Sequence, residues 1–511
     1  MTWKSILVST TVAVGIAMVT SGSAFAAEKR EAPKYGGTLN VLTMYSMLNA
    51  LGWNHKNWMW KSNHDGLNLD HLIAGDLDKG PRGTNEFEYR AQAYLPEKVW
   101  RGELAESWDV KQNPLRLEFK LRKGVFWPAK EGVMEKREVV ADDITYHFKT
   151  MSESKRKIPT YWDFIKEWKS TDKYTAVAYL NSYNANWGYR IGWGYYDAII
   201  PPEVHNLNDG KGPKDWTQVN GTGPYKVSKV TKGREHIYEK NEDYWDTETI
   251  NGIAYKLPYN DKVVYNIVKD EATRIALLRS GKVDLYEAFR PHFVKALRDS
   301  APELIIREAL ATQGTFIALR TDKKPFDNKK VRQAMNLAVN QQEILDTLLF
   351  GKGEILNYPF SSGWKSLYTP IEKLKPSSQM LFDYDPEKAK KLLAEAGYAD
   401  GFDFEVMVST ADPYHMDVIG LLQAYYANVG ITLKAKTLEY AAFRSQMRKP
   451  SQSAGYLMNN GEGNPFSVLR KSYKSGQTWN PAFTQILNSI KNGMKLLRRL
   501  IRINVQKCSW R

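Results

Sequence analysis

Residues that could ligate a metal ion gather near the N-terminal end, where Asn63-His64-Asp65 is followed by Asp70-His71. Imidazole and carboxylate groups are usual protein ligands of zinc and similar ions. The two histidines stand seven positions apart, however, which matches no typical ligand spacing. We therefore expect this stretch to form a solvated loop, and we expect no metal site.

Asp142 and Asp143 form a second set of side chains that could do chemistry. Paired carboxylates hydrolyse glycosides when they face each other across a gap of about 5 to 10 Å. Here they are adjacent and precede the apolar residues Ile144, Phe148 and Met151, which better fits an acidic N-cap and first turn of a helix. A secreted hydrolase is therefore only the second hypothesis.

Sequence motifs of common enzymes are missing: the chain has no H-E-x-x-H, G-x-S-x-G, Walker A or G-x-G-x-x-G in context. The single cysteine, Cys508, lies close to the C-terminus, which argues against a catalytic role, and no internal disulfide can form. We expect no catalytic residues, no enzyme activity and no cofactor.

Local patterns indicate the elements that position these residues. Apolar and polar residues alternate over Leu115–Leu121, which predicts a half-buried strand, and Lys123-Gly124 ends it. Further along, residues 402–408 and 431–435 are typical of strands, with a helix expected between them at 416–428. Strand and helix alternate here, which favours an α/β lobe.

Four segments in this order resemble bacterial extracellular solute-binding proteins of family 5, the peptide- and nickel-type receptors of ABC importers. Residues 104–151 are similar to the family's signature region of strand, turn and helix. Residues 220–245 contain its GTGPY hairpin and N-x-x-Y-W, and residues 274–285 resemble its helix-GxVD element. Residues 327–351, helical in spacing but broken at Asn340-Gln341, resemble the opening of its last lobe.

This resemblance implies an α/β fold of the periplasmic-binding-protein type II (cluster C), with two lobes and an extra insertion lobe. The expected boundaries are a signal peptide at 1–26, lobe I at 27–75 and 201–289, insertion lobe II at 76–200, lobe III at 290–483 and an atypical basic tail at 484–511.

Two segments resemble the parts of peptide-binding relatives that line the ligand cleft. The first, an E-W-x-x-F-like segment that supplies an aromatic ring, is EYAAF at residues 439–443. The second supplies a carboxylate for the peptide α-ammonium, and here it is GYLMNNGE at residues 455–462, with the neutral Asn459 at the carboxylate position. An amide cannot replace a carboxylate at equal strength beside a buried ammonium. Either Glu462 substitutes for it, or the ligand has no free α-amino group there.

We therefore expect Tyr440 and Tyr456 to line the cleft and Asn459 or Asn460 to make a polar contact with the ligand. Other aromatic residues cluster in segments that read as loops, where they could stack on sugars or apolar side chains, although core packing is the commoner role for each. They are Trp53, Trp58, Trp60, Trp187, Trp193, Tyr195 and Tyr196.

The two ends of the chain carry further information. Lys4, an apolar run at 6–19 and the cleavage pattern Ala24-Phe25-Ala26 predict a cleavable signal peptide and a periplasmic protein. Residues 484–511 contain seven basic residues and no acid, so without them and Lys4 the formal charge of +15 falls to +7. Nucleic-acid binding is therefore unsupported.

The basic tail also departs from the family pattern after residue 483. Residues 490, 494, 497 and 501 share a helical face, which would suit a membrane-surface helix. The abrupt loss of acids and of family similarity favours instead a truncated or frameshifted C-terminus.

The first hypothesis is thus a monomeric periplasmic receptor that closes over a solute and docks on the membrane permease subunits of an ABC importer. A peptide is the expected ligand, and an oligosaccharide such as a galactoside is the alternative.

Overall fold

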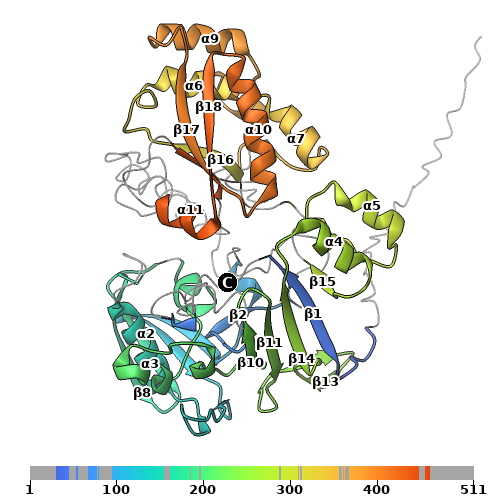
Figure 1. The fold of residues 1–511 in the computed structure, drawn as a ribbon. Helices are drawn as coiled ribbons and strands as arrows, with labels where there is room; N and C mark the ends of the chain where they lie inside the picture. Colours follow the sequence, from blue (N-terminus) through green and yellow to red (C-terminus); the bar gives the residue numbers. More distant parts are fainter. Residues whose placement is uncertain are drawn as a thin grey trace, which may run out of the picture.

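The computed structural model describes residues 30–44, 53–55, 67–77, 79, 95–154, 162–184, 186–194, 197–286, 289–308, 310, 314–355, 360, 362, 368–447 and 455–460. Three sheets, each with its own helices, build this part of the chain (Figure 1). We call the bodies around them lobe I, lobe II and lobe III, with the boundaries expected above except that residues 289–308, which pack on the core beside α4, are counted with lobe I.

Lobe I is built on a five-stranded sheet in the order β10-β11-β14-β1-β15. Strand β1 runs parallel to β14 and β15, whereas β11 runs antiparallel to β10 and β14. Helices α4 (Glu271–Arg279) and α5 (Phe293–Ser300) pack together beside this sheet. The strand bounds are Tyr225–Thr231, Glu235–Lys240, Lys262–Ile267, Thr38–Thr43 and Leu285–Tyr286, in the same order.

Lobe II has an antiparallel sheet in the order β4-β5-β9-β8, covered by helix α2 (Ala141–Glu153). Its strands span Ala105–Gln112, Leu115–Leu121, Thr175–Leu180 and Ile165–Asp172. The alternating pattern of β5 holds as predicted, because Leu117, Phe119 and Leu121 are the buried members of the strand. Phe148 of α2 stacks on Trp168 of β8 with 4.6 Å between the ring centroids.

Lobe III has a four-stranded sheet in the order β16-β19-β17-β18. Its strands span Gly314–Leu319, Gly455–Asn460, Phe402–Ser409 and Ile431–Leu438. The helices around it are α6 (Lys329–Leu337), α7 (Gln341–Leu349), α9 (Pro386–Glu395), α10 (Pro413–Ala427) and α11 (Tyr440–Gln446). The predicted break at Asn340 is confirmed, since its side chain accepts the Glu343 N–H and caps α7.

Short elements complete the fold. Three two-stranded ribbons are β2-β3 (Ile73–Gly75, Trp100–Gly102), β6-β7 (Phe126–Trp127, Arg137–Glu138) and β12-β13 (Thr247–Ile250, Ile253–Lys256). The remaining helical turns are Glu97–Val99, Gly188–Gly192, α3 (Pro202–Gly210), Trp216–Gln218, Ile371–Lys373, α8 (Pro376–Gln379) and Met380–Phe382. None of the helices within the described ranges has both the length and the apolar content needed to cross a bilayer.

The start of α2 corrects one detail of the sequence analysis. Val140, not an aspartate, is the N-cap residue, and Asp143 lies at the third helical position. The Asp143 carboxylate accepts the Val140 N–H at 3.0 Å, so it still satisfies a free donor at the helix start. An acidic residue of the first turn therefore stabilises the start of the helix, as predicted. It does so from the third helical position and not from the N-cap.

Candidate functional site

The carboxyl edge of the lobe III sheet has the geometry of a binding crevice. Strands β18 and β19 both run parallel to β17 and lie on opposite sides of it. From β17 the chain runs through α10 to β18 on one side, and from β18 it runs through α11 to β19 on the other side of β17. In open α/β sheets, ligands bind outside the carboxyl ends of the strands at such a reversal of strand order.

The two connecting helices cover opposite faces of this sheet. Along β17, Val406 and Val408 pack in the core that contains α10, whereas Met407 packs with Phe443 of α11. Figure 1 shows α11 on the side of lobe III that faces lobes I and II. The end of β18 and the start of α11 thus lie at the edge directed toward the other two lobes.

Three predicted ligand residues lie at this edge. Tyr440 begins α11, where it is half-buried, and the Arg444 guanidinium lies 5.9 Å from its ring centroid. In the last residues of β19, Asn459 pairs with Thr315 and Asn460 pairs with Gly314 of β16. Glu462 lies outside the described residues. The fold therefore places Tyr440 after the carboxyl end of β18, and Asn459 and Asn460 at the carboxyl end of β19, two strands that flank β17.

Two other predicted ligand residues are buried in cores. Tyr456 is 2% exposed and makes an edge-to-face contact with Phe443, with 6.2 Å between the ring centroids. Trp193 is 7% exposed and packs on Tyr189 in the lobe II core. In this conformation neither ring has a face open to a solute.

The remaining aromatic residues expected to line a cleft are either buried in cores or lie outside the described residues. Trp53 and Trp187 are each 3% exposed and belong to cores of lobes I and II, which is the packing role expected for most of them. Trp58, Trp60, Tyr195 and Tyr196 lie outside the described residues.

A buried polar cluster joins lobe II to lobe I, and the sequence analysis missed it. We call Asp70, His71, Glu103 and Asp197 the junction cluster. The His71 ring lies between two carboxylates, with Nδ1 3.5 Å from Glu103 Oε2 and Nε2 3.7 Å from Asp197 Oδ1. His71 belongs to lobe I and the two carboxylates to lobe II, so these contacts fasten one lobe to the other, and Trp245 Nε1 of lobe I donates to the neighbouring Asp70 Oδ2 at 2.9 Å.

Burial sets the ionisation of the junction cluster. Burial raises the pKa of Asp197 to about 7, and burial together with the charge of Glu103 raises that of Asp70 to about 7. Burial opposes the charged form of His71, but the Glu103 hydrogen bond and the Asp197 charge outweigh it and raise the pKa to about 9. His71 is therefore an imidazolium held by carboxylates at neutral pH.

This burial corrects the expectation of a solvated loop at Asp70 and His71. Asp70 is 1% exposed and lies in the junction cluster. His64 and Asp65 fall outside the described residues. Within the part of the chain that the structure describes, no group of three or more His, Cys, Asp or Glu side chains could hold a metal ion.

The GTGPY hairpin explains why the segment around Asp70 is held so closely. A Cβ atom on Gly221 would lie 1.9 Å from the Asn68 carbonyl oxygen, and one on Gly223 would lie 2.5 Å from the Asn68 carbonyl carbon. Tyr225 N donates to the Leu67 carbonyl oxygen at 3.1 Å. The glycines of this motif therefore permit close backbone packing next to the junction cluster.

The carboxylates considered for a hydrolase have structural partners. Asp143 is 3% exposed and accepts hydrogen bonds from Arg137 at 2.8 and 2.9 Å and from Trp127 Nε1 at 2.9 Å. A carboxylate buried and engaged in this way is not accessible to a substrate. The pair Asp142-Asp143 therefore gives the hydrolase hypothesis no support.

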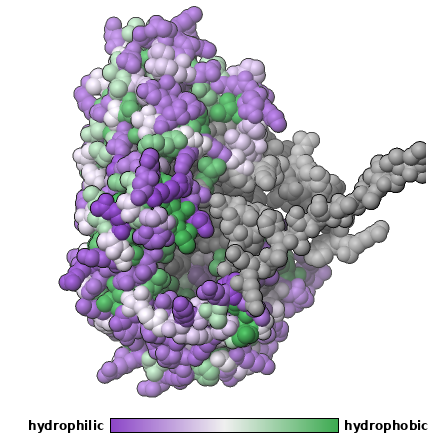
Figure 2. Space-filling model, turned by 90° about the vertical axis from the view of Figure 1, so that its right-hand side faces the viewer, coloured by the Kyte–Doolittle hydropathy of each residue, from purple (hydrophilic) through white to green (hydrophobic). Residues whose placement is uncertain are grey.

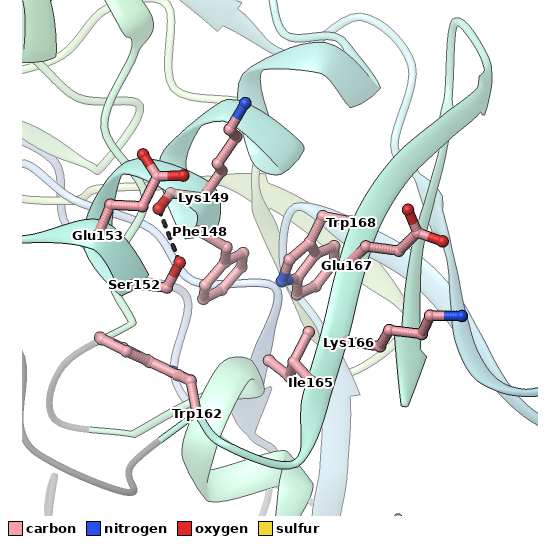
Figure 3. A pocket seen from close by; sticks show the side chains of 9 residues that line it. All are labelled: Phe148, Lys149, Ser152, Glu153, Trp162, Ile165, Lys166, Glu167 and Trp168. Carbon is pink, nitrogen blue, oxygen red and sulfur yellow. Dashed lines mark hydrogen bonds between the residues drawn. The ribbon is translucent and has the colours of Figure 1, made fainter. Parts of the chain in front are cut away.

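A cavity of about 320 Å³ opens on lobe II between the second half of α2 and the start of β8 (Figure 3). Phe148, Trp162, Ile165 and Trp168 surround it, while the charged ends of the neighbouring lysines and glutamates turn away. None of the predicted ligand residues lines this cavity.

Figure 2 shows hydrophilic residues over most of this face, with hydrophobic side chains in several separate patches. The class of protein that this fold and edge geometry define is a multi-lobed α/β solute receptor.

Comparisons with known proteins agree with that class. The model of the family "Bacterial extracellular solute-binding proteins, family 5 Middle" matches residues 100–479. Heme-binding protein A of Haemophilus influenzae is 28% identical over 407 residues, which cover 76% of this chain and 71% of that protein. Di/tripeptide-binding protein 3 of Pseudomonas aeruginosa is 26% identical over 381 residues, covering 70% and 68%.

A solved structure shows the same fold. The periplasmic binding protein DppA of Helicobacter pylori, in complex with the peptide STSA, superposes with a TM-score of 0.70 at 23% identity. The match covers 88% of this chain and 84% of that chain. The chain therefore has the mixed α/β fold of the cluster C periplasmic binding proteins.

The chain belongs to the bacterial extracellular solute-binding proteins of family 5. These proteins bind solutes and are not enzymes, so the prediction of a non-enzymatic receptor is confirmed. The comparisons give no support to a truncated C-terminus or to an oligosaccharide ligand, and the basic tail at 484–511 lies outside the described residues.

Proposed function

We propose that this chain captures a peptide-like solute between lobe III and lobes I and II, and delivers it to the membrane permease of an ABC importer. The single observation that carries the proposal is the carboxyl edge of the lobe III sheet, where strand order reverses around β17. Peptide-binding proteins among the relatives, including one solved with the peptide STSA, support the ligand class.

We assign ligand contact to Tyr440, Asn459, Asn460 and Glu462. Tyr456 and Trp193 receive a supporting role, because each is more than nine-tenths buried among other side chains. Residues 1–26 are inferred to be a cleavable signal peptide that directs the chain to the periplasm, where we expect it to act as a monomer.

The neutral amide at position 459 affects which N-terminal group of a peptide ligand is preferred. A peptide α-ammonium that leaves water needs a charged partner, and Asn459 supplies none. The preferred peptide should therefore bind almost equally well with a free or an acetylated N-terminus, unless Glu462 provides the charge.

Titration of intrinsic tryptophan fluorescence tests the proposal. The probes are a mixed set of di-, tri- and tetrapeptides, the same peptides with acetylated N-termini, and hemin. We expect a saturable response to one or more peptides, with less than a three-fold loss on acetylation. A saturable response to hemin and none to any peptide would reject the peptide assignment and favour the ligand class of Heme-binding protein A.

A charge introduced at position 459 sharpens this test. The substitution Asn459→Asp should strengthen binding of free-amine peptides roughly ten-fold relative to their acetylated forms, because a carboxylate pairs with the ammonium. Ser445→Asp adds the same charge at an exposed position of α11 that is not assigned to the site, and it serves as the control. Equal gains in both variants would mean that bulk charge, not position 459, governs the preference.

A further inference from the structure

The connection between lobe I and lobe III carries two charge triads of opposite sign. Residues 289–308 and 310 are the described part of the chain between β15 of lobe I and β16 of lobe III. Phe289, Leu304 and Ile306 pack on the apolar core beside α4 and α5, so this segment moves with lobe I.

Arg290 is the centre of the first triad. Its Nε donates to Glu271 Oε2 at 2.7 Å, and Glu271 begins α4 in lobe I. Its Nη1 donates to Asp417 Oδ2 at 2.7 Å, across 127 positions of sequence, and Asp417 lies on α10 in lobe III. One guanidinium thus holds a carboxylate from each lobe.

Glu308 is the centre of the second triad, with the charges reversed. Its Oε1 lies 3.0 Å from Arg298 Nη2 of α5, in lobe I. Its Oε2 lies 2.6 Å from the Nζ of Lys352, which follows α7 in lobe III. Lobe I therefore presents a cation to Asp417 and an anion to Lys352.

Each lobe I centre keeps a second partner in its own lobe. If the bridge to Asp417 breaks, Arg290 still pairs with Glu271, and if the bridge to Lys352 breaks, Glu308 still pairs with Arg298. The side chains are also partly exposed, with 44% for Asp417 and 49% for Lys352, so water can replace the lost contacts. Bridges with these properties can break and form again without leaving a buried charge alone.

We propose that Arg290–Asp417 and Glu308–Lys352 form a reversible electrostatic latch that sets the orientation of lobe III on lobe I and thereby tunes ligand affinity. The latch stabilises the lobe arrangement of this structure, and a ligand that prefers another arrangement must first break it. Apparent affinity then depends on the fraction of molecules in the binding-competent arrangement. This inference rests on the lobe closure of the proposed function.

The experiment measures lobe orientation without ligand, so its outcome does not depend on the identity of the ligand. Spin labels at the exposed positions 169 of lobe II and 391 of lobe III, introduced by Lys169→Cys and Lys391→Cys in a Cys508→Ser background, report the inter-lobe distance distribution by double electron–electron resonance. The variants are Asp417→Asn, Lys352→Gln and their combination.

We expect each variant to change the ratio of inter-lobe arrangements two- to five-fold, the range of an exposed ion pair. We also expect 1 M salt to shift the unsubstituted protein in the same direction and to have little effect on the double variant. The control is Glu395→Gln, which breaks the Lys330–Glu395 pair at 3.1 Å within lobe III. The proposal is overturned if the two bridge variants leave the distribution unchanged or if Glu395→Gln shifts it equally.

Failure of the latch and failure of the ligand assignment are distinguishable. An unchanged distance distribution together with saturable peptide binding rejects the latch alone. A shifted distribution together with no peptide binding rejects only the ligand assignment.

Discussion

Lobe I meets lobe II and lobe III in two different ways. At the boundary with lobe II, Asp70 and Asp197 are at most 1% exposed, and the imidazolium of His71 lies between carboxylates. At the boundary with lobe III, the charges are paired across the chain connection, with Asp417 and Lys352 nearly half exposed. The same kinds of charged groups are therefore buried at one boundary and accessible to water at the other.

This difference indicates which boundary can move. Separating lobe II from lobe I would pull the charged groups of the junction cluster away from one another. Removing one partner from a buried group of charges is costly in free energy. Separating lobe III from lobe I only exchanges an exposed ion pair for water. Lobes I and II should therefore behave as one body, and the hinge should lie between lobes I and III.

The largest effect is expected from His71→Leu at the first boundary. The substitution removes the imidazolium of the junction cluster and leaves Glu103, which holds its Nδ1, without that cationic partner. We expect a loss of about 3 to 5 kcal/mol in the free energy of unfolding at pH 6, measured by urea denaturation. His292→Leu, at an exposed position, should change the free energy by less than about 0.5 kcal/mol.

The pH dependence of that loss gives a second check on His71. The pKa of His71 in the folded protein is about 9, above the ordinary value of 6.5. Between pH 6.5 and 9 the folded protein therefore keeps a proton on His71 that the unfolded chain releases. The stability that His71 contributes is fully present below pH 6.5 and disappears as the pH rises through 9. A loss in His71→Leu that stayed constant from pH 6 to 9 would mean that packing, not charge, holds the junction.

An effect of opposite sign is expected at His55, in the lobe I part of the first boundary. His55 is 3% exposed, neither ring nitrogen has a hydrogen-bond partner among the described residues, and burial lowers its pKa to about 3. The folded protein therefore resists protonation below pH 6.5, and stability falls as the pH drops from 6.5 toward 3.

Replacement of this imidazole should remove that acid sensitivity. His55→Leu is expected to lessen the loss of stability between pH 6.5 and pH 5 by about 2 kcal/mol, at about 1.4 kcal/mol per pH unit. Melting temperatures of both proteins across this range measure it. Parallel pH profiles for the two proteins would show that His55 titrates normally.

Local pattern was sufficient to predict several elements. The alternation in Leu115–Leu121 gave β5 with its observed bounds, and the strands expected at 402–408 and 431–435 are β17 and β18. These features depend on neighbours within a few residues, where steric and hydrogen-bonding rules act directly. Local rules cannot give the order of the lobes, which was expected from the family resemblance alone.

Long-range packing explains what could not be predicted. The junction cluster unites residues from position 70 to position 197, so no spacing rule could indicate that Asp70 and Asp197 are both buried beside the partly exposed His71. Tyr456 sits in a segment similar to a cleft segment, yet it lies beneath Phe443 because the side chains of β19 alternate between the faces covered by α10 and α11.

The smallest effect on stability is expected at the boundary between lobe I and lobe III. Asp417→Asn removes one exposed end of the latch while Arg290 keeps Glu271, so the free energy of unfolding should change by less than about 1 kcal/mol. Urea denaturation at 50 mM and 1 M salt measures this change, which should shrink at high salt because exposed ion pairs are screened. A loss as large as that of His71→Leu would show that the two boundaries are equally rigid, and the hinge would then have to lie elsewhere.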